Sequence, residues 1–432
     1  MNVRKRFSRA EVREALASSA LRHEKYGDLS RFDAVVLPST GSLSYPDVAD
    51  PLYIHLTATM RCNARCKGCI SSAVTFKNSS PSGIEDTVPE RDVEAIARLV
   101  ERDHPGPVTV CIYGGEPLLV PDKLVRVISL LRRRLPERHL RFMIYTNGEL
   151  LGQAVDAAPR LGTDVWLYSV SIDGGVRQHN EIRRGTDLGR IRENLRALKR
   201  GYKGEILMWS TLREEQSLTD CFDEFLRLHD EGLVNHFFWH WVEESEPMAD
   251  LETFAAAYEN GLRNIMETYV ARLEGGELFS IVHVNELILY YLTGKKRNSS
   301  ACGVELAHNY DIVGGQVRPC ADLPPEYTLG RIEPDGTLAI SEKNLAVLVD
   351  YKRALGCYEC GVHSYCGGRC PVQALTGKVA RIVQYCQLMR LHVALVGDYV
   401  GKIERALARH SITGRDLWAR SASYAQLTDV TP

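Results

Sequence analysis

The chain of 432 residues carries 53 basic and 55 acidic side chains, and 44% of its residues are hydrophobic. This size is enough for a full hydrophobic core and for two domains, and the composition excludes a disordered tail. The nearly balanced charge gives no indication of the basic surface that nucleic acid recognition requires. No apolar run reaches membrane-spanning length, and the basic start, residues 1–6, is followed by an amphipathic stretch. We therefore expect a soluble cytoplasmic protein without a membrane partner.

The first half of the chain reads as alternating strands and helices. Residues 1–50 are predicted to form an N-terminal extension with one helix over 9–26. Over 51–245 short apolar runs alternate with helical stretches, which is typical of parallel strands joined by crossover helices. The predicted strands are 52–58, 108–113, 141–146, 165–171, 205–211 and 236–242, and the helices between them include 93–102, 122–134, 188–199 and 218–229. This pattern predicts an α/β fold with a partial, TIM-like (β/α)6 barrel.

The second half has a different pattern. Residues 246–300 are predicted to be a helical linker with helices over 249–273 and 284–292. Cysteines gather again over 301–388, which we interpret as a small α+β domain. We expect the remaining residues, 389–432, to form a helix, continuous over 388–409, and a polar tail.

The predicted strands have one polar face. Alternate side chains point to opposite sides of a strand, so residues of one parity, odd or even in number, share one side. In the first four predicted strands the odd-numbered residues are mostly polar: Tyr53, His55 and Thr57; Thr109, Cys111 and Tyr113; Arg141, Met143, Tyr145 and Asn147; and Ser169, Ser171 and Asp173. The other parity is aliphatic. Since the interior of a closed eight-stranded barrel is filled with bulky aliphatic side chains, this polarity favours an open barrel whose lumen holds a ligand.

Twelve cysteines in a chain without a secretion signal indicate metal binding and not disulfides. Cys62, Cys66 and Cys69 follow the first predicted strand in a CxxxCxxC spacing. Three thiolates on one short loop would leave one iron of a 4Fe-4S cluster open to another ligand. A zinc loop is the alternative, although structural zinc sites use four ligands.

Glycine-containing motifs follow the next three strands. Gly114-Gly115-Glu116-Pro117 follows the second, Asn147-Gly148 the third, and Ser171-Ile172-Asp173-Gly174 the fourth. Each could be ordinary turn chemistry. Because the carboxyl ends of parallel strands meet at one edge of a barrel, we expect these motifs to converge beside the cysteines.

The CxxxCxxC spacing and the GGEP segment resemble the radical S-adenosylmethionine (SAM) superfamily. The resemblance implies that the open iron binds SAM and that an electron converts SAM to a 5'-deoxyadenosyl radical. It implies SAM contacts at Gly114, Gly115, Glu116, Asn147, Ser171 and Asp173. The aromatic residue that the superfamily commonly has before the third cysteine is replaced by Gly68, so we expect the adenine to be held by another residue, such as Ile70 or Phe76.

The later cysteines are similar in order to the SPASM domain, which holds two auxiliary 4Fe-4S clusters in a subgroup of this superfamily. The resemblance assigns Cys302, Cys320 and Cys370 to auxiliary cluster I, with a fourth ligand from water, another side chain or substrate. It assigns Cys357, Cys360, Cys366 and Cys386 to auxiliary cluster II. One zinc ion bound by Cys357, Cys360, Cys366 and Cys370 is the alternative.

Two further residues are candidates for catalysis. Cys111 has the parity of the lumen and could return a hydrogen atom to a substrate radical, although a buried packing role is the more common use of such a thiol. Asp322, two residues beyond Cys320, could act as a base, although a solvated carboxylate is the simpler interpretation.

We therefore predict a radical SAM/SPASM enzyme that abstracts a hydrogen atom from a peptide or protein substrate, with SAM and three 4Fe-4S clusters as cofactors. A radical epimerase or dehydrogenase acting on a sugar or other natural-product intermediate is the alternative, and a zinc-binding module without catalysis is a more distant one. The expected partners are the substrate and a reducing protein such as flavodoxin or ferredoxin. Dehydrogenation, crosslinking and epimerisation remain open as outcomes.

Overall fold

The computed structural model describes residues 8–18, 22–23, 27–28, 35–49, 51–69, 84–103, 106–306, 309–323, 325–341, 343–421 and 423–424. Ile70 and Phe76 lie outside these residues. Helix α1 (Arg9–Ser18) packs against α15 (Val379–Gly397) and α12 (Tyr351–Leu355). It ends at Ser18, well before the predicted end at residue 26.

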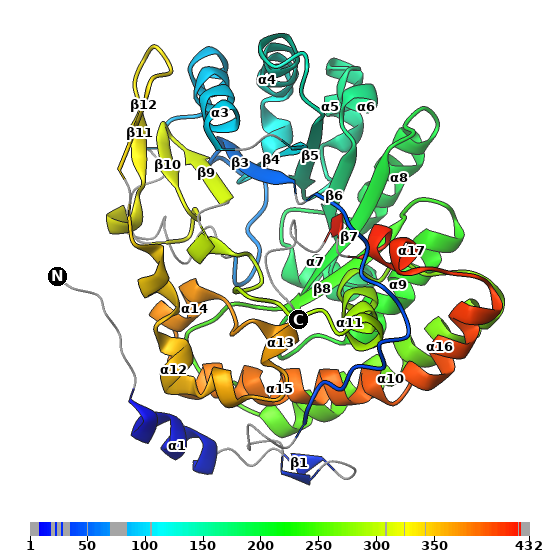
Figure 1. Cartoon of the computed structure of the whole chain (residues 1–432). Coiled ribbons are helices and arrows are strands. Elements are labelled where there is room, and N and C mark those ends of the chain that lie inside the picture. Colours follow the sequence, from blue (N-terminus) through cyan, green and yellow to red (C-terminus); the bar gives the residue numbers. More distant parts are fainter. Residues whose placement is uncertain are drawn as a thin grey trace.

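The core of the molecule is a curved sheet wrapped by helices (Figure 1). Its parallel part consists of β3 (Leu52–Thr59), β4 (Val108–Gly114), β5 (Leu140–Thr146), β6 (Leu167–Ser171), β7 (Glu205–Leu212) and β8 (His236–Trp241). All six predicted strands are present within two residues of their predicted ends, and each pairs in parallel with the next. The prediction of an α/β partial barrel is therefore confirmed.

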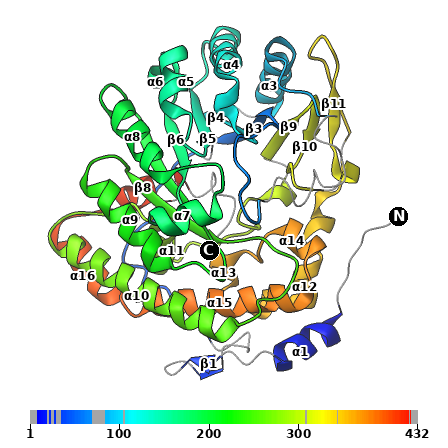
Figure 2. The same ribbon diagram turned by 180° about the vertical axis from the view of Figure 1, so that it is seen from behind.

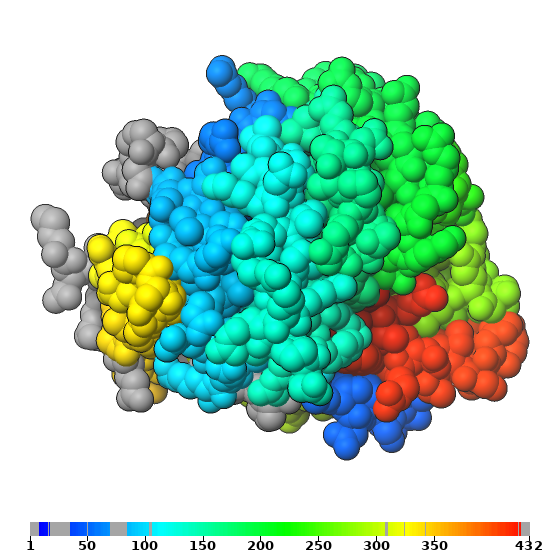
Figure 3. All heavy atoms as spheres, turned by 90° about the horizontal axis from the view of Figure 1, so that it is seen from above, coloured from blue at the N-terminus to red at the C-terminus, as the bar shows by residue number. Residues whose placement is uncertain are grey.

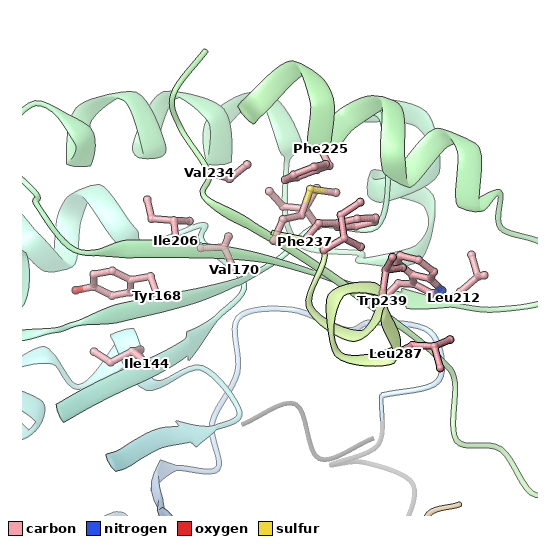
Figure 4. Packing of buried hydrophobic residues seen from close by; sticks show 14 of the residues in the cluster. Ile144, Tyr168, Val170, Ile206, Leu212, Phe225, Val234, Phe237, Trp239 and Leu287 are labelled. Atoms are coloured by element: carbon pink, nitrogen blue, oxygen red, sulfur yellow. The ribbon is translucent and has the colours of Figure 1, made fainter. Parts of the chain in front are cut away.

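Helices cover the outside of this sheet. Those between the strands are α3 (Pro89–Asp103), α4 (Pro121–Arg134), α5 (Leu151–Ala157), α6 (Leu161–Asp164), α7 (Val176–Ile182), α8 (Leu188–Lys199) and α9 (Leu218–Asp230). The aliphatic parity of the strands packs against them, as Figure 4 shows where Phe225 of α9 lies beside Phe237 of β8. Seen from above, α3 to α6 form one continuous outer surface (Figure 3).

Four short strands extend the sheet beyond β3, and the sequence analysis did not identify them. Strand β9 (Asn309–Val313) pairs in parallel with β3, and β10 (Gln316–Arg318), β11 (Gly330–Ile332) and β12 (Leu338–Ile340) continue as antiparallel neighbours. The sheet therefore has ten strands in the order β12-β11-β10-β9-β3-β4-β5-β6-β7-β8. It runs without interruption across the boundary predicted at residue 300.

The remaining helices close the open side of the sheet. They are α10 (Leu251–Glu274), α11 (Val282–Thr293), α13 (His363–Cys366), α14 (Pro371–Thr376), α16 (Val400–Arg409) and α17 (Gly414–Ala419). Figures 1 and 2 show α10 and α15 side by side below the barrel. The helix predicted over 388–409 is wrong in its bounds, because α15 begins at Val379 and a break at Asp398 and Tyr399 separates it from α16. In the described part of the chain no helix is long and apolar enough to span a bilayer.

The inner face of the barrel has two layers. The lower layer is apolar and consists of Tyr53, Cys111, Met143, Leu167, Leu207 and Phe238, all buried. The upper layer, toward the carboxyl ends of the strands, carries His55, Tyr113, Tyr145 and Ser171 and faces a cavity. The upper half of the predicted polar face is thus the part that lines the cavity, which places the cavity at the carboxyl edge of the sheet.

Candidate functional site

A cavity of about 350 Å³ lies at the carboxyl ends of β3 to β8. Two groups of cysteines contribute to its wall, one from the loop after β3 and one from the C-terminal region. They are Cys62, Cys66 and Cys69, and Cys302, Cys320 and Cys370. The fold thus brings residues more than 200 positions apart in the sequence to one cavity.

The loop that carries the first three cysteines, residues 60–69, is called the cysteine loop below. Its backbone is fixed to the turn after α7 by hydrogen bonds from the Arg65 amide to the Arg184 carbonyl, at 2.7 Å, and from the Lys67 amide to the Ile182 carbonyl, at 2.9 Å. The Asn147 side-chain amide donates to Asn63 Oδ1 at 2.8 Å. These bonds hold the three thiols in place before any metal is present.

Gly68 has a left-handed conformation, with φ of +60°, and packs closely against other cavity residues. A Cβ atom there would lie 3.2 Å from Glu244 Oε1 and 3.3 Å from Arg213 Nε. The left-handed φ itself favours glycine at this position.

The Gly114-Gly115 pair lies where the end of β4 passes the start of the cysteine loop. A Cβ atom on Gly114 would lie 2.1 Å from the Thr59 carbonyl oxygen, and one on Gly115 would lie 2.3 Å from the Arg61 carbonyl oxygen. Only glycine allows such a close approach of two backbones. Both glycines line the cavity.

Glu116 was predicted as a SAM contact; its side chain is fully buried and does not line the cavity. Its carboxylate accepts hydrogen bonds from the Asn147 amide at 2.8 Å, the Thr146 hydroxyl at 2.8 Å and the Leu118 amide at 3.0 Å. Burial raises the pKa of Glu116 to about 7, although these hydrogen bonds oppose the shift. The side chain therefore joins the ends of β4 and β5.

Asn147 and Ser171 line the cavity, as expected, whereas Asp173 is fully buried behind its wall. Asp173 pairs with Arg183 at 2.8 Å and with Arg213 at 3.2 Å, and it accepts a hydrogen bond from the Thr211 amide at 2.9 Å. Burial alone would raise the pKa of Asp173, but the two guanidinium groups outweigh it and lower the pKa below its usual value. Asp173 thus holds two arginines in position.

The seven C-terminal cysteines fall into two spatial groups. Cys302, Cys320 and Cys370 line the central cavity, whereas Cys357, Cys360, Cys366 and Cys386 enclose a small internal cavity of their own. Cys370 is thus not part of the second group, which disfavours the alternative of one zinc ion bound by Cys357, Cys360, Cys366 and Cys370. Within the described ranges, no three His, Cys, Asp or Glu side chains are close enough to share a single metal ion.

Burial raises the pKa of most of these thiols, and nearby arginine side chains oppose the rise at several of them. The positive charges of Arg183 and Arg213 act on Cys66, and Arg390 Nη2 donates to Cys360 Sγ at 3.7 Å. Such buried cations offset the negative charge of sulfur ligands. Thiols are the donor groups that hold iron-sulfur clusters, and three groups of them lie in the walls of the two cavities.

Residues 56–216 match the family model described as the Radical SAM superfamily. The chain carries a radical SAM domain. No curated protein sequence matches the chain.

Solved structures with the same fold extend the likeness into the C-terminal region. A structure of "Native anSMEcpe with bound AdoMet" is 17% identical, with a TM-score of 0.63 over 82% of this chain and 99% of that chain. A structure of "Native anSMEcpe with bound AdoMet and Cp18Cys peptide" is also 17% identical, with a TM-score of 0.61 over the same shares. Streptococcus suis SuiB bound to S-adenosylmethionine is 19% identical, with a TM-score of 0.45 over 77% and 73% of the two chains. The two anSMEcpe structures establish the fold.

Several residues that face the cavity have no sequence motif. Arg213 lies at the end of β7, and Trp209 and His240 lie on β7 and β8. Tyr145 packs edge-on against Trp209, with ring centroids 5.8 Å apart. The alternation of side chains along the strands placed His55 and Tyr145 in the lumen. The same alternation, applied to the last two strands, would also have placed Trp209 and His240 there.

A buried ion pair joins the two halves of the cavity wall. His55 Nδ1 on β3 lies 3.1 Å from Asp311 Oδ1 on β9, and the Tyr113 hydroxyl donates to Asp311 Oδ2 at 3.5 Å. Burial would lower the pKa of His55, but Cys111 and Asp311 raise it well above its usual value. Asp311 could not be identified from sequence because β9 was not.

The two predicted catalytic residues differ in position. Asp322 lines the cavity beside Cys320. Cys111 is fully buried in the apolar lower layer, beneath the cavity, and does not line it.

Proposed function

We propose that the protein is a radical SAM enzyme of the SPASM subgroup with three 4Fe-4S clusters. Cys62, Cys66 and Cys69 would hold the cluster that binds SAM. Auxiliary cluster I would be held by Cys302, Cys320 and Cys370, and auxiliary cluster II by Cys357, Cys360, Cys366 and Cys386. When bound, SAM and its cluster supply a 5'-deoxyadenosyl radical that abstracts a hydrogen atom from carbon.

The observation that carries this proposal is the shared cavity. The three cysteines of the cysteine loop and the three of the proposed auxiliary site I line the same cavity of about 350 Å³. A substrate between them would be within reach of both, so that hydrogen abstraction on one side and electron removal or ligation on the other could act on one molecule.

The chain's own residues bind SAM and exclude water from it. The backbone of Gly114 and Gly115 offers carbonyl groups to the SAM ammonium group because no side chain blocks the approach. Asn147 and Ser171 supply polar groups along the same edge, and Arg213, held by Asp173, supplies a positive charge for a carboxylate. The packed lower layer closes the site below.

A peptide or protein is the first candidate substrate. The support is the likeness to anSMEcpe, whose structure contains a bound peptide. The fold that the two proteins share covers 82% of this chain.

A sugar or other small natural-product intermediate is the second candidate. Tyr145, Trp209 and His240 give the cavity aromatic surfaces, and Asp311 and Asp322 place carboxylates on the opposite wall. Flat aromatic surfaces with a few polar groups are common in pockets for small molecules.

Metal analysis and SAM cleavage test the proposed function together. Anaerobically purified protein should contain about twelve irons per chain, and it should form 5'-deoxyadenosine from SAM after reduction by dithionite. Replacing the three cysteines of the cysteine loop by alanine should remove about four irons and abolish 5'-deoxyadenosine. Replacing Cys302, Cys320 and Cys370 should remove the same amount of iron and leave SAM cleavage in place. A colourless zinc protein would refute the proposal.

The Cys221→Ala variant is the matched control, because Cys221 is buried in α9 away from every cysteine group. Its iron content and its yield of 5'-deoxyadenosine should equal those of the wild type. Candidate substrates can then be compared in deuterated water. Deuterium at a retained carbon would support epimerisation, and loss of two hydrogens would support dehydrogenation or crosslinking.

A further inference from the structure

The turn after Cys320 is held from both sides by charged residues. The Ala321 amide donates a hydrogen bond to Asp311 Oδ2 on β9, and the Ala321 carbonyl accepts one from Arg318 Nη1 on β10, at 3.3 Å. Ala321, Asp311 and Arg318 are all buried. Because Ala321 directly follows Cys320, these two bonds hold the backbone next to that cysteine in place.

Asp311 also connects this turn to the barrel. In the register of β9 and β3, Asp311 lies opposite His55, and His55 Nδ1 is 3.1 Å from Asp311 Oδ1. The Tyr113 hydroxyl on β4 donates to Asp311 Oδ2 at 3.5 Å. One carboxylate therefore joins β3, β4 and the turn after Cys320. It does so in the wall of the central cavity, which all four residues line.

Both members of this pair are charged. Burial acts to lower the pKa of His55, but Cys111 and Asp311 outweigh it and raise the pKa well above its usual value. The imidazole is therefore protonated at neutral pH and forms an ion pair with Asp311. The side chains of His55 and Asp311 are only 8% and 11% exposed, so water and salt screen their charges weakly.

We propose that Asp311 and His55 are positioning residues that hold the turn after Cys320 and set the reduction potential of the proposed auxiliary cluster I. The proposal rests on the proposed function, in which Cys302, Cys320 and Cys370 hold this cluster. Reduction adds one negative charge to an iron-sulfur cluster. A nearby carboxylate therefore opposes reduction, and a nearby imidazolium favours it.

The position of the pair links this potential to the chemistry of the cavity. In the proposed function, one electron moves from a substrate radical to auxiliary cluster I. The substrate becomes a carbocation or, after loss of a proton to water, gains a double bond. The driving force of this transfer depends on the potential of the cluster. Two opposite charges in the wall can adjust it in either direction, although neither residue is a ligand.

Redox titration of the anaerobically purified holoenzyme, followed by electron paramagnetic resonance, measures the potential. The signal of auxiliary cluster I is the one that is absent from Cys302→Ala/Cys320→Ala/Cys370→Ala. The Asp311→Asn variant keeps an oxygen acceptor for the Ala321 amide but loses the negative charge, so the potential should rise. At a fixed solution potential the ratio of reduced to oxidised cluster should increase about tenfold, which corresponds to about 59 mV for a one-electron couple.

The His55→Gln variant should shift the potential in the opposite direction. It removes the positive charge and leaves the hydrogen bond between Asp311 and the Ala321 amide in place. The potential should therefore fall, and the ratio of reduced to oxidised cluster should decrease. General loosening of the cavity wall would shift the potential of both variants in the same direction. The opposite signs thus distinguish an electrostatic role from a merely structural one.

The matched controls are Glu224→Gln and Arg192→Gln, which break a second buried ion pair one charge at a time. Arg192 Nε donates to Glu224 Oε1 at 2.8 Å, and the two side chains are 15% and 0% exposed. The pair joins α8 to α9 on the outside of the barrel and does not line the cavity. Both variants should keep the wild-type potential of auxiliary cluster I.

The outcomes separate this inference from the proposed function. An unchanged potential in Asp311→Asn or His55→Gln overturns the inference, as does a shift of the same sign in both or an equal shift in the controls. If Asp311→Asn fails to retain auxiliary cluster I, His55→Gln decides alone: a lower potential supports the inference, and an equal or higher one overturns it. A wild type without iron, or without the signal of auxiliary cluster I, would refute the proposed function instead.

Discussion

Replacing Asp173 by asparagine should destabilise the protein and weaken SAM binding. The Asp173 carboxylate is fully buried and neutralises Arg183 and Arg213, whose side chains are 11% and 4% exposed. Asparagine keeps the shape and the acceptor for the Thr211 amide but removes the charge, so that two buried cations lose their partner. Removing one member of a buried ion pair costs about 3–5 kcal/mol.

The free energy of unfolding is measured by urea denaturation followed by far-UV circular dichroism, on anaerobically prepared wild type and Asp173→Asn. The matched control is Glu231→Gln, which breaks the pair of Glu231 with Arg196 at 2.7 Å, where both side chains are more than a third exposed. This control should lose less than about 1 kcal/mol. SAM affinity, from equilibrium dialysis, should fall about tenfold in Asp173→Asn and stay constant in the control. A loss of stability in Asp173→Asn no larger than that of the control would refute the structural role given to this carboxylate.

Three further predictions concern separate parts of the molecule. The Gly115→Ala variant should bind SAM at least about tenfold more weakly than the wild type. The added Cβ would lie 2.3 Å from the Arg61 carbonyl oxygen and would force the end of β4 away from the cysteine loop. A wild-type SAM affinity in equilibrium dialysis would contradict this prediction. Burial lowers the pKa of His392 to about 3. Below about pH 6.5 this histidine is therefore protonated in the unfolded chain but stays neutral in the folded chain, so the free energy of unfolding decreases as the pH is lowered. At pH 5 the free energy of unfolding should be about 2 kcal/mol lower than at pH 7.5 because of this residue. In His392→Gln the free energy of unfolding, measured by urea denaturation, should depend less steeply on pH than in the wild type. The Arg390→Met variant loses the hydrogen bond to Cys360 and a buried positive charge, so the reduction potential of the proposed auxiliary cluster II should be lower. Redox titration followed by electron paramagnetic resonance measures this potential, and an unchanged value would contradict the prediction.

The six parallel strands could be predicted because each is an apolar run of five to eight residues that is bounded by turn residues and followed by a helix. The motifs at their ends could be predicted for the same reason. Strands β10 to β12 have three residues each, which is too short for alternation to be visible. The position of β9, which carries Asp311, was also missed, and with it the contact of Asp311 with His55.

The roles of charged residues at the site were harder to predict than their positions. Glu116 and Asp173 were identified from motifs as SAM contacts, but both are buried and hold other groups in place. Arg213 is 40 residues from Asp173 in sequence, and the pair forms only because β6 and β7 are neighbours. A single sequence shows which residues end a strand but not which side chain each one meets.

The pairing of β9 with β3 has a consequence for how the protein is made. Strand β3 is synthesised well before β9, so its outer edge acquires a hydrogen-bonding partner only after residues 309–313 have been synthesised. Until then the exposed edge of β3 can pair with other nascent chains. Truncation before residue 309 should therefore yield aggregates and not a smaller soluble barrel, and loading of iron into the nascent protein should follow the completion of translation.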